Sequence, residues 1–219
     1  MKKILIRTLH LLLAVLFVWP VLGSAQELKQ ISLPKPDLEG GRPLMQVLKD
    51  RHSTREFSNE KLSMQMLSNL LWAAAGINRP ESGKRTAPSA VNWQETDVYV
   101  ASPDGLYLYE AKTNSLKQIL AQDIRAMTGT QSYVAEAAVN LIYVADFLKM
   151  GKATDEQKVL YSAAGTGFIS ENVYLFCASA GLATVVRASI DKPELAKIMK
   201  LRPEQRIILA QSVGYPKKK

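Results

Sequence analysis

Apolar positions recur at helical spacing once the chain leaves its proline- and glycine-rich start. In the stretch PLMQVLKD this spacing predicts a short helix that has Pro43 at its first position and ends near Arg51. A second helix is expected from the N-cap Ser63 to Gly76, a residue that suits a left-handed stop. Residues 51–57, with the sequence RHSTREF, are therefore expected between two helices, at the surface.

The second half of the chain contains a long helical stretch of unusual composition. Residues 155–180 are rich in alanine and glycine, and Gly181 is expected to end the helix. Such a run of small side chains indicates that another part of the molecule approaches the helix backbone closely. A further short helix is expected after the N-cap Asp191, with Pro193 in its first turn.

Runs of alternating or continuous apolar residues predict the strands. TDVYVAS (96–102) and LYLYE (106–110) flank the turn sequence Pro-Asp-Gly, which favours a hairpin. VNLIYVAD (139–146) is apolar nearly throughout and is expected to be a central strand. Two more strands are expected at 182–189 and 206–214. Because strands and helices alternate irregularly around a hairpin, the predicted fold class is α+β rather than a doubly wound sheet.

The N-terminus has the layout of a signal peptide. Three cations precede the apolar run LLLAVLFVW, and the small residues GSA follow it. The run is shorter than the roughly 20 apolar residues of a membrane span, so we expect cleavage after Ala25, with an uncleaved anchor as the alternative. The chain is therefore divided into a signal peptide (1–25), an extended arm that could wrap a partner (26–42) and a domain (43–219). A secreted or periplasmic protein is expected.

Charge and composition exclude several classes of protein. The 219-residue chain has a formal net charge of +8, and loss of residues 1–25, with three cations and no acid, leaves +5. Three of these charges are the terminal lysines, so the body is nearly neutral, which argues against nucleic-acid binding. Cys177 is the only cysteine, so no internal disulfide can form. His52 is the only histidine after the signal, and no metal-ligand cluster, G-x-S-x-G elbow or P-loop occurs.

Three separated segments offer hydrogen-bonding capacity. In RHSTREF, Arg51, Ser53 and Arg55 can bind a phosphate or polar ring edges, although a solvated basic loop at a helix end is the simpler interpretation. TAPSAVNWQ (86–94) precedes the first strand and, taken alone, is a loop. YPKKK (215–219), taken alone, is a solubilising tail.

Together and in this order, with the helix end AGLATVV between them, these segments resemble the nitroreductase family of flavin mononucleotide (FMN) enzymes over about residues 43–217. The resemblance implies a nitroreductase-like fold, in which a central, mostly antiparallel sheet is flanked by helices and two chains form an intertwined homodimer. It also implies FMN as cofactor, with the flavin carrying the chemistry and no metal or catalytic side chain required.

The resemblance assigns FMN contacts to RHSTREF and to the C-terminus. Arg51 and Ser53 would bind the phosphate and the ribityl chain, and His52 would add a contact. Arg55 would donate to the pyrimidine edge of the ring. Lys217 would reach the phosphate.

Further contacts are implied around the flavin ring. Three residues would line the ring, from the other protomer or from the opposite wall: Pro88, Ser89 and Asn92. Backbone N–H groups near Ala188 and Ser189 would approach flavin N5 and O4, although VVRAS lacks a glycine that some members have there. Gln131 would reach the ring edge.

The leading functional hypothesis is a secreted FMN-dependent oxidoreductase that passes electrons to a small planar acceptor, such as a nitroaromatic or a quinone. Some relatives instead oxidise azoline rings in modified peptides. Two alternatives are a non-catalytic flavin- or anion-binding protein on the same scaffold and a structural dimer with an empty pocket. The sequence names neither the substrate nor the electron donor; since pyridine nucleotides are cytoplasmic, a membrane redox partner is one source of electrons.

Overall fold

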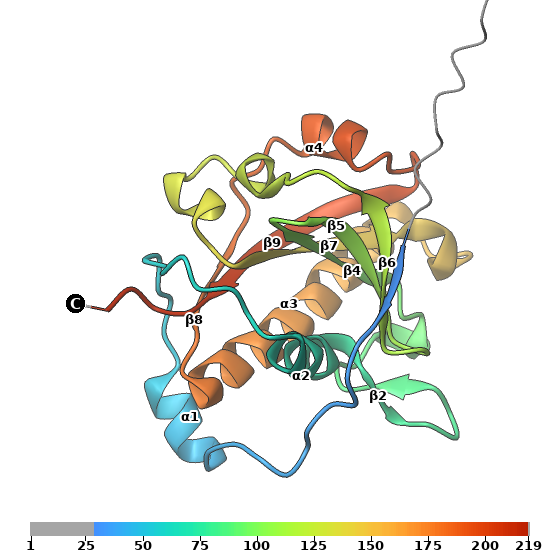
Figure 1. The fold of residues 1–219 in the computed structure, drawn as a ribbon. Helices are drawn as coiled ribbons and strands as arrows, with labels where there is room; N and C mark the ends of the chain where they lie inside the picture. The colour runs from blue at the N-terminus through green and yellow to red at the C-terminus, as the bar shows by residue number, and fades with distance from the viewer. Residues whose placement is uncertain (1–28, 219) are drawn as a thin grey trace, which may run out of the picture.

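The computed structural model describes residues 29–218, which form a seven-stranded sheet with helices on both faces (Figure 1). The strand order is β1-β6-β5-β4-β7-β9-β8, and every neighbouring pair is antiparallel. The strands are β1 (Gln30–Ser32), β4 (Thr96–Ser102), β5 (Gly105–Glu110), β6 (Ser115–Leu120), β7 (Val139–Asp146), β8 (Ala183–Arg187) and β9 (Gln205–Gly214), and a separate hairpin is formed by β2 (Ile77–Arg79) and β3 (Lys84–Arg85). This arrangement confirms the predicted α+β class and antiparallel sheet.

The helices cover the two faces of this sheet unequally. They are α1 (Leu44–Asp50), α2 (Met64–Ala75), α3 (Asp155–Ala180) and α4 (Lys192–Ile198), with 3-10 turns η1 (Ala90–Asn92), η2 (Arg125–Thr128), η3 (Ser132–Ala135) and η4 (Phe147–Met150). The larger hydrophobic core joins α2 and α3 to one face, and a smaller core joins α4 to the other. β7 is buried along its whole length between these layers, as its apolar sequence predicted.

The predicted helix ends rest on local hydrogen bonds. Ser63 Oγ accepts from the Met66 N–H at 3.1 Å and so caps α2. Asp191 caps α4 in the same way. Gly181 ends α3 in the left-handed conformation, with a φ of 71°. These predictions are confirmed, as is the hairpin of β4 and β5.

Other local predictions were wrong in detail. Gly76 has a φ of −69°, so it is not a left-handed stop; it is required because a Cβ there would lie 2.4 Å from Cδ1 of Trp72. Pro43 is the N-cap of α1 rather than its first helical residue. β1 and β6 were not predicted, since β1 is very short and β6 mixes lysine and glutamine with its apolar residues. The strand expected at 182–189 is shorter, Ala183–Arg187.

The described part of the arm lies along its own chain. β1 pairs with β6 at the sheet edge, and further on the Asp37 N–H donates to Asn69 Oδ1 of α2 at 2.9 Å. The Arg42 N–H then donates to Ser179 Oγ of α3 at 2.9 Å. The predicted signal peptide and the first residues of the arm lie outside the described residues. Within residues 29–218, no helix combines the length and the apolar character needed to cross a bilayer.

Candidate functional site

Residues 51–57 lie next to the C-terminal segment in the fold. Phe57 forms a β-bridge with Pro216, and the Ser58 N–H donates to the Tyr215 oxygen at 2.9 Å. The Lys217 N–H donates to the Glu56 oxygen at 3.3 Å. This pairing brings two segments that are far apart in the sequence side by side, so the cations of RHSTREF and of the C-terminus share one region.

Tyr174 of α3 holds the first part of this segment in place. Its hydroxyl lies 2.8 Å from Ser53 Oγ and accepts from the Val186 N–H of β8 at 2.9 Å. The guanidinium carbon of Arg51 lies 5.2 Å from the centre of the Tyr174 ring, within the range of a cation–π contact. The Thr54 N–H also donates to Thr184 of β8 at 2.9 Å. Because β8 is the last strand of the sheet, these contacts place RHSTREF along that edge of the sheet.

Gln131, Ala188 and Ser189 come together just beyond the end of β8. The Thr130 N–H donates to the Ser189 oxygen at 3.2 Å, and the hydroxyls of the two residues are 2.7 Å apart. The side chains of Ala188 and Ser189 are exposed. Gln131 Oε1 is buried and accepts no hydrogen bond from a described residue. Its neighbourhood therefore has an acceptor that a ligand N–H could satisfy.

A buried arginine holds the segments around Gln131 and Ser189 to the sheet. Arg187, at the end of β8, is only 6% exposed and donates to the backbone oxygen and the hydroxyl of Thr128, to Asn140 Oδ1 and to Ser212 Oγ. Burial lowers the pKa of Arg187 to about 10. Arg187 forms no ion pair with a residue of the described chain, so its charge is compensated by neutral acceptors alone.

His52 points toward α1 in this structure. Its Nδ1 lies 2.6 Å from the backbone oxygen of Asp50, and the Asp50 carboxylate pairs with Arg42. The Arg42 guanidinium lowers the pKa of that carboxyl. Beside it lies a cavity of about 200 Å³, whose lining includes His52, Thr54 and Tyr174.

The segment with Pro88, Ser89 and Asn92 has a strained backbone. Val91, Asn92 and Gln94 all have positive φ, at 40°, 59° and 49°. Left-handed backbone is unusual for a β-branched residue, and such strain concentrates at functional sites. Side-chain bonds brace the turn: the Gln94 N–H donates to Ser89 Oγ at 3.0 Å, and Gln94 Nε2 donates to Asn92 Oδ1 at 3.1 Å. Val91 itself is 81% exposed, beside a cavity of about 640 Å³.

The structure thus gathers the predicted residues into two groups. The first comprises eight residues around β8 and the C-terminus: Arg51, His52, Ser53, Arg55, Gln131, Ala188, Ser189 and Lys217. The second comprises Pro88, Ser89 and Asn92, and the first two of these line a cavity together with Gly165 of α3. Gly165 and Tyr174 are nine residues apart in α3, or about 14 Å along the helix axis.

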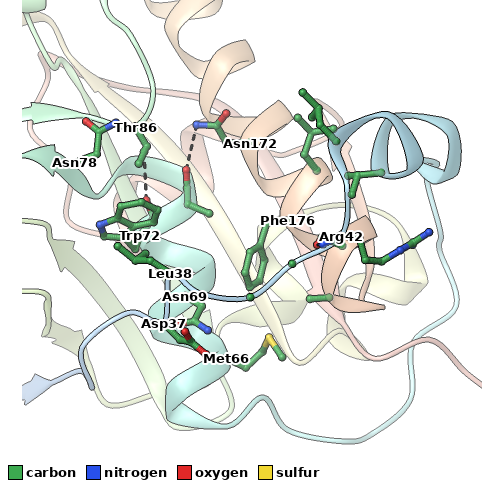
Figure 2. Close-up of a pocket in the computed structure, with 18 residues that line it drawn as sticks. Asp37, Leu38, Arg42, Met66, Asn69, Trp72, Asn78, Thr86, Asn172 and Phe176 are labelled. Atoms are coloured by element: carbon green, nitrogen blue, oxygen red, sulfur yellow. Dashed lines mark hydrogen bonds between the residues drawn. The ribbon is translucent and has the colours of Figure 1, made fainter.

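A further cavity of about 610 Å³ contains none of the predicted residues. It lies between the arm, α2 and α3, and its walls include Leu38, Trp72 and Phe176 (Figure 2). Hydrogen bonds from Asn172 to the Ala73 oxygen at 3.1 Å and from Thr86 to the Trp72 oxygen at 3.2 Å border it. Its walls are mainly apolar side chains and amides, and the charged residues among them are Asp37 and Arg42.

The charges and hydroxyl groups of the first group are of the kind that bind an anion. Arg51, Arg55 and Lys217 form no ion pair with the part of the chain that the structure describes, and Arg55 and Lys217 are exposed. Together with the neutral hydroxyl of Ser53, these charged donors are of the kind that bind phosphate. Tyr174 and Arg187 support the site but carried no signal in the sequence, because each acts through contacts with remote segments.

The fold and this group of residues define an α+β protein with a cationic, hydroxyl-rich surface along an edge strand of its sheet. The chain belongs to the nitroreductase family, whose family model matches residues 48–215. A protein of Methanocaldococcus jannaschii that is named as a nitroreductase is 30% identical over 177 residues, which cover 76% of this chain and 88% of that protein.

Solved structures share the fold. A crystal structure of a Ralstonia eutropha protein named as a nitroreductase has a TM-score of 0.83 and 44% identity, and the match covers 87% of this chain and 90% of that one. A nitroreductase from Desulfovibrio desulfuricans, solved in complex with FMN, has a TM-score of 0.59 and 20% identity over 81% of this chain and 88% of that one. The second likeness concerns the fold alone.

Proposed function

We propose that this protein is an FMN-dependent oxidoreductase that passes electrons to a small planar acceptor, such as a nitroaromatic or a quinone. The observation that carries the proposal is the group of cations without acidic partners, Arg51, Arg55 and Lys217, on two segments that pair through their backbones. Such a group suits a dianionic phosphate on a ligand that also has a polar ring edge. Membership of the nitroreductase family supports the assignment of that ligand as FMN.

Each residue would have a separate task in binding. Arg51, Ser53 and Lys217 would bind the phosphate and the ribityl chain, and Tyr174 would keep the first two oriented. Arg55 would place a positive charge at the pyrimidine edge, where it stabilises negative charge that reduction adds to the ring. The unpartnered oxygen of Gln131 would accept from a ring N–H. Bound FMN itself supplies the transfer of electrons.

We further propose a homodimer in which residues 88–92 of one protomer complete the site of the other. The two groups of predicted residues lie apart within one chain, which supports this division. Exposed apolar side chains follow α3 and α1 and are suited to an interface: Leu44, Met45, Leu48, Val159, Leu160, Tyr161 and Phe168. Light scattering should report a dimer at low micromolar concentration, and Phe168→Glu should shift it toward the monomer and weaken FMN binding. A stoichiometrically FMN-loaded monomer of the wild type contradicts the proposal.

We propose that the protein acts outside the cytoplasm after removal of residues 1–25. The cations, apolar run and small residues at the N-terminus support this location. Mass spectrometry of the protein from a periplasmic or culture fraction should find Gln26 as the first residue. Recovery only from the cytoplasm, with the first 25 residues intact, would refute this location.

FMN titration tests the central proposal. Protein comprising residues 26–219 should quench FMN fluorescence with a sharp endpoint of one FMN per chain, and unchanged fluorescence at micromolar protein would remove the proposal. The loaded protein is then reduced photochemically without oxygen and mixed with a nitroaromatic or a quinone. Rapid reoxidation supports an oxidoreductase, whereas binding without reoxidation by any acceptor favours the non-catalytic flavin-binding alternative.

A further inference from the structure

A small cavity with polar and apolar walls lies between α3 and the segment that carries Pro88, Ser89 and Asn92. Its lining includes Arg85, Glu95, Thr96 and Gly165, and its volume is about 20 Å³. A volume of this size accommodates a single water molecule, provided that the walls offer two to four polar partners.

Unpartnered polar atoms are concentrated in the wall of this cavity. Six buried side-chain nitrogen and oxygen atoms of residues 29–218 have no hydrogen-bond partner in the chain, and four of them are Arg85 Nε, both carboxyl oxygens of Glu95 and Thr96 Oγ1. Glu95 is only 1% exposed. Buried polar atoms are rarely left without a partner, so a concentration of them at one place indicates a ligand.

Glycine at position 165 keeps the cavity open on the side of α3. A Cβ at this position would lie 2.9 Å from Glu95 Oε1 and 4.0 Å from Thr96 Oγ1. The small residue thus lets the helix backbone approach these two side chains while room remains for one more small group. This close approach is of the kind that the small residues of the helix sequence predicted.

The chemistry of the walls favours a neutral ligand that both accepts and donates hydrogen bonds. Arg85 Nε–H can only donate, the Glu95 carboxylate can only accept, and the Thr96 hydroxyl can do either. The positive charges of Arg85 and Lys149 both act on the Glu95 carboxyl group. Lys149 is itself paired with Asp97, at 2.6 Å. A metal cation would therefore be repelled by Arg85, whereas a water molecule can form a hydrogen bond with each of these three groups.

We propose that this cavity is a buried water site, in which one ordered water molecule joins the Arg85 Nε–H to the Glu95 carboxyl and the Thr96 hydroxyl. The water would thus join the two ends of the segment 85–96, Arg85 at one end and Glu95 and Thr96 at the other, at the surface of α3. Backbone with positive φ at Val91, Asn92 and Gln94 persists only where the surroundings hold it, and the water is one of the groups that do so. Its relevance to the cofactor rests on the proposed function, because only then do residues 88–92 face a flavin.

Crystallography of the purified protein comprising residues 26–219 tests the site directly and does not require FMN. Density for one water within hydrogen-bond distance of Arg85 Nε and Glu95 supports the proposal. Crystals soaked in rubidium salt distinguish a cation, since rubidium gives an anomalous signal. A rubidium peak in the cavity, a partner side chain filling it, or a closed and dry site would overturn the proposal. None of these outcomes depends on whether FMN binds.

Thr96→Val gives a test in solution, because the direction of the change in melting temperature distinguishes a bound water from an unpartnered hydroxyl. If the hydroxyl truly lacks a partner, its replacement by an isosteric methyl in a strand should leave the melting temperature unchanged or raise it. If the hydroxyl binds the water, the melting temperature should fall by about 2–4 °C. Hydrogen exchange of residues 88–96 should also become faster, while that of residues 51–58 should not change. Thr128→Val is the control, because the partners of that buried hydroxyl are known and its loss must lower the melting temperature.

Discussion

Tyr174→Phe removes one hydroxyl from the centre of the candidate site and leaves the ring in place. The hydroxyl accepts from the Val186 N–H at 2.9 Å and lies 2.8 Å from Ser53 Oγ. Ser53 is exposed and can bond to water instead, so little stability is lost there. The half-buried Val186 N–H loses its partner, which costs about 1–2 kcal/mol at the lower end of the range for an unsatisfied buried donor. For a domain of this size the melting temperature should fall by about 2–8 °C.

The same substitution should weaken FMN binding moderately. Arg51 keeps its ring contact, but Ser53 loses the group that holds its side chain in one orientation. Ordering one side chain costs about 0.5–1.5 kcal/mol, so the dissociation constant should rise by about two- to tenfold. Thermal unfolding followed by circular dichroism measures the first effect in the FMN-free protein, and FMN fluorescence titration measures the second.

Tyr161→Phe is the matched control for this experiment. Tyr161 lies on the same helix, and its hydroxyl bonds to no described residue. Because phenylalanine keeps the apolar ring that the proposed dimer interface uses, the melting temperature and FMN affinity of this variant should equal those of the wild type. If Tyr174→Phe matches this control in both assays, Tyr174 does not position RHSTREF. If stability falls but FMN affinity does not, Ser53 is not a ligand of the flavin.

Three further predictions concern charged groups. Arg51→Ala should weaken FMN binding roughly tenfold or more, because one charge-assisted contact contributes about 1.5–3 kcal/mol. Arg55→Ala should lower the midpoint potential of bound FMN more than Arg51→Ala does. Equal shifts of the two potentials in a spectroelectrochemical titration would mean that the two side chains are wrongly assigned. Burial raises the pKa of Glu95, so the stability of the wild type falls as pH rises through the folded pKa. Glu95→Gln should therefore be more stable than the wild type near pH 8 and lose this advantage below about pH 4. An equal difference in stability at both pH values, measured by urea denaturation, would contradict the assignment. Arg187→Met leaves several buried acceptors unpaired and should lower the free energy of unfolding by about 2–4 kcal/mol. Arg206 on β9 is exposed, so Arg206→Met should change this free energy by no more than about 0.5 kcal/mol. Similar values for both variants would show that the buried network contributes little.

Local features of the fold could be predicted from the sequence because their causes lie within a few residues. The caps Ser63 and Asp191 bond to backbone groups three residues away, and the turn between β4 and β5 is specified by the residues inside it. The donor chemistry of RHSTREF could likewise be read from its side chains. Where the local signal was ambiguous, as at Gly76, the sequence identified the residue but not the reason for it, because that reason is the nearby indole of Trp72.

Only the tertiary structure decided which of these groups meet. Ser53 and Tyr174 are 121 positions apart, and Arg187 and Thr128 are 59 apart, so no periodicity in the sequence connects them. Their contacts depend on the strand order, which places β8 at the edge of the sheet beside α3. The buried carboxyl of Glu95 shows the same limit: a glutamate beside a strand is expected to face water, and only the packing of α3 through Gly165 encloses it. Composition and spacing determine what each segment can bind, whereas the path of the chain determines which segments bind together.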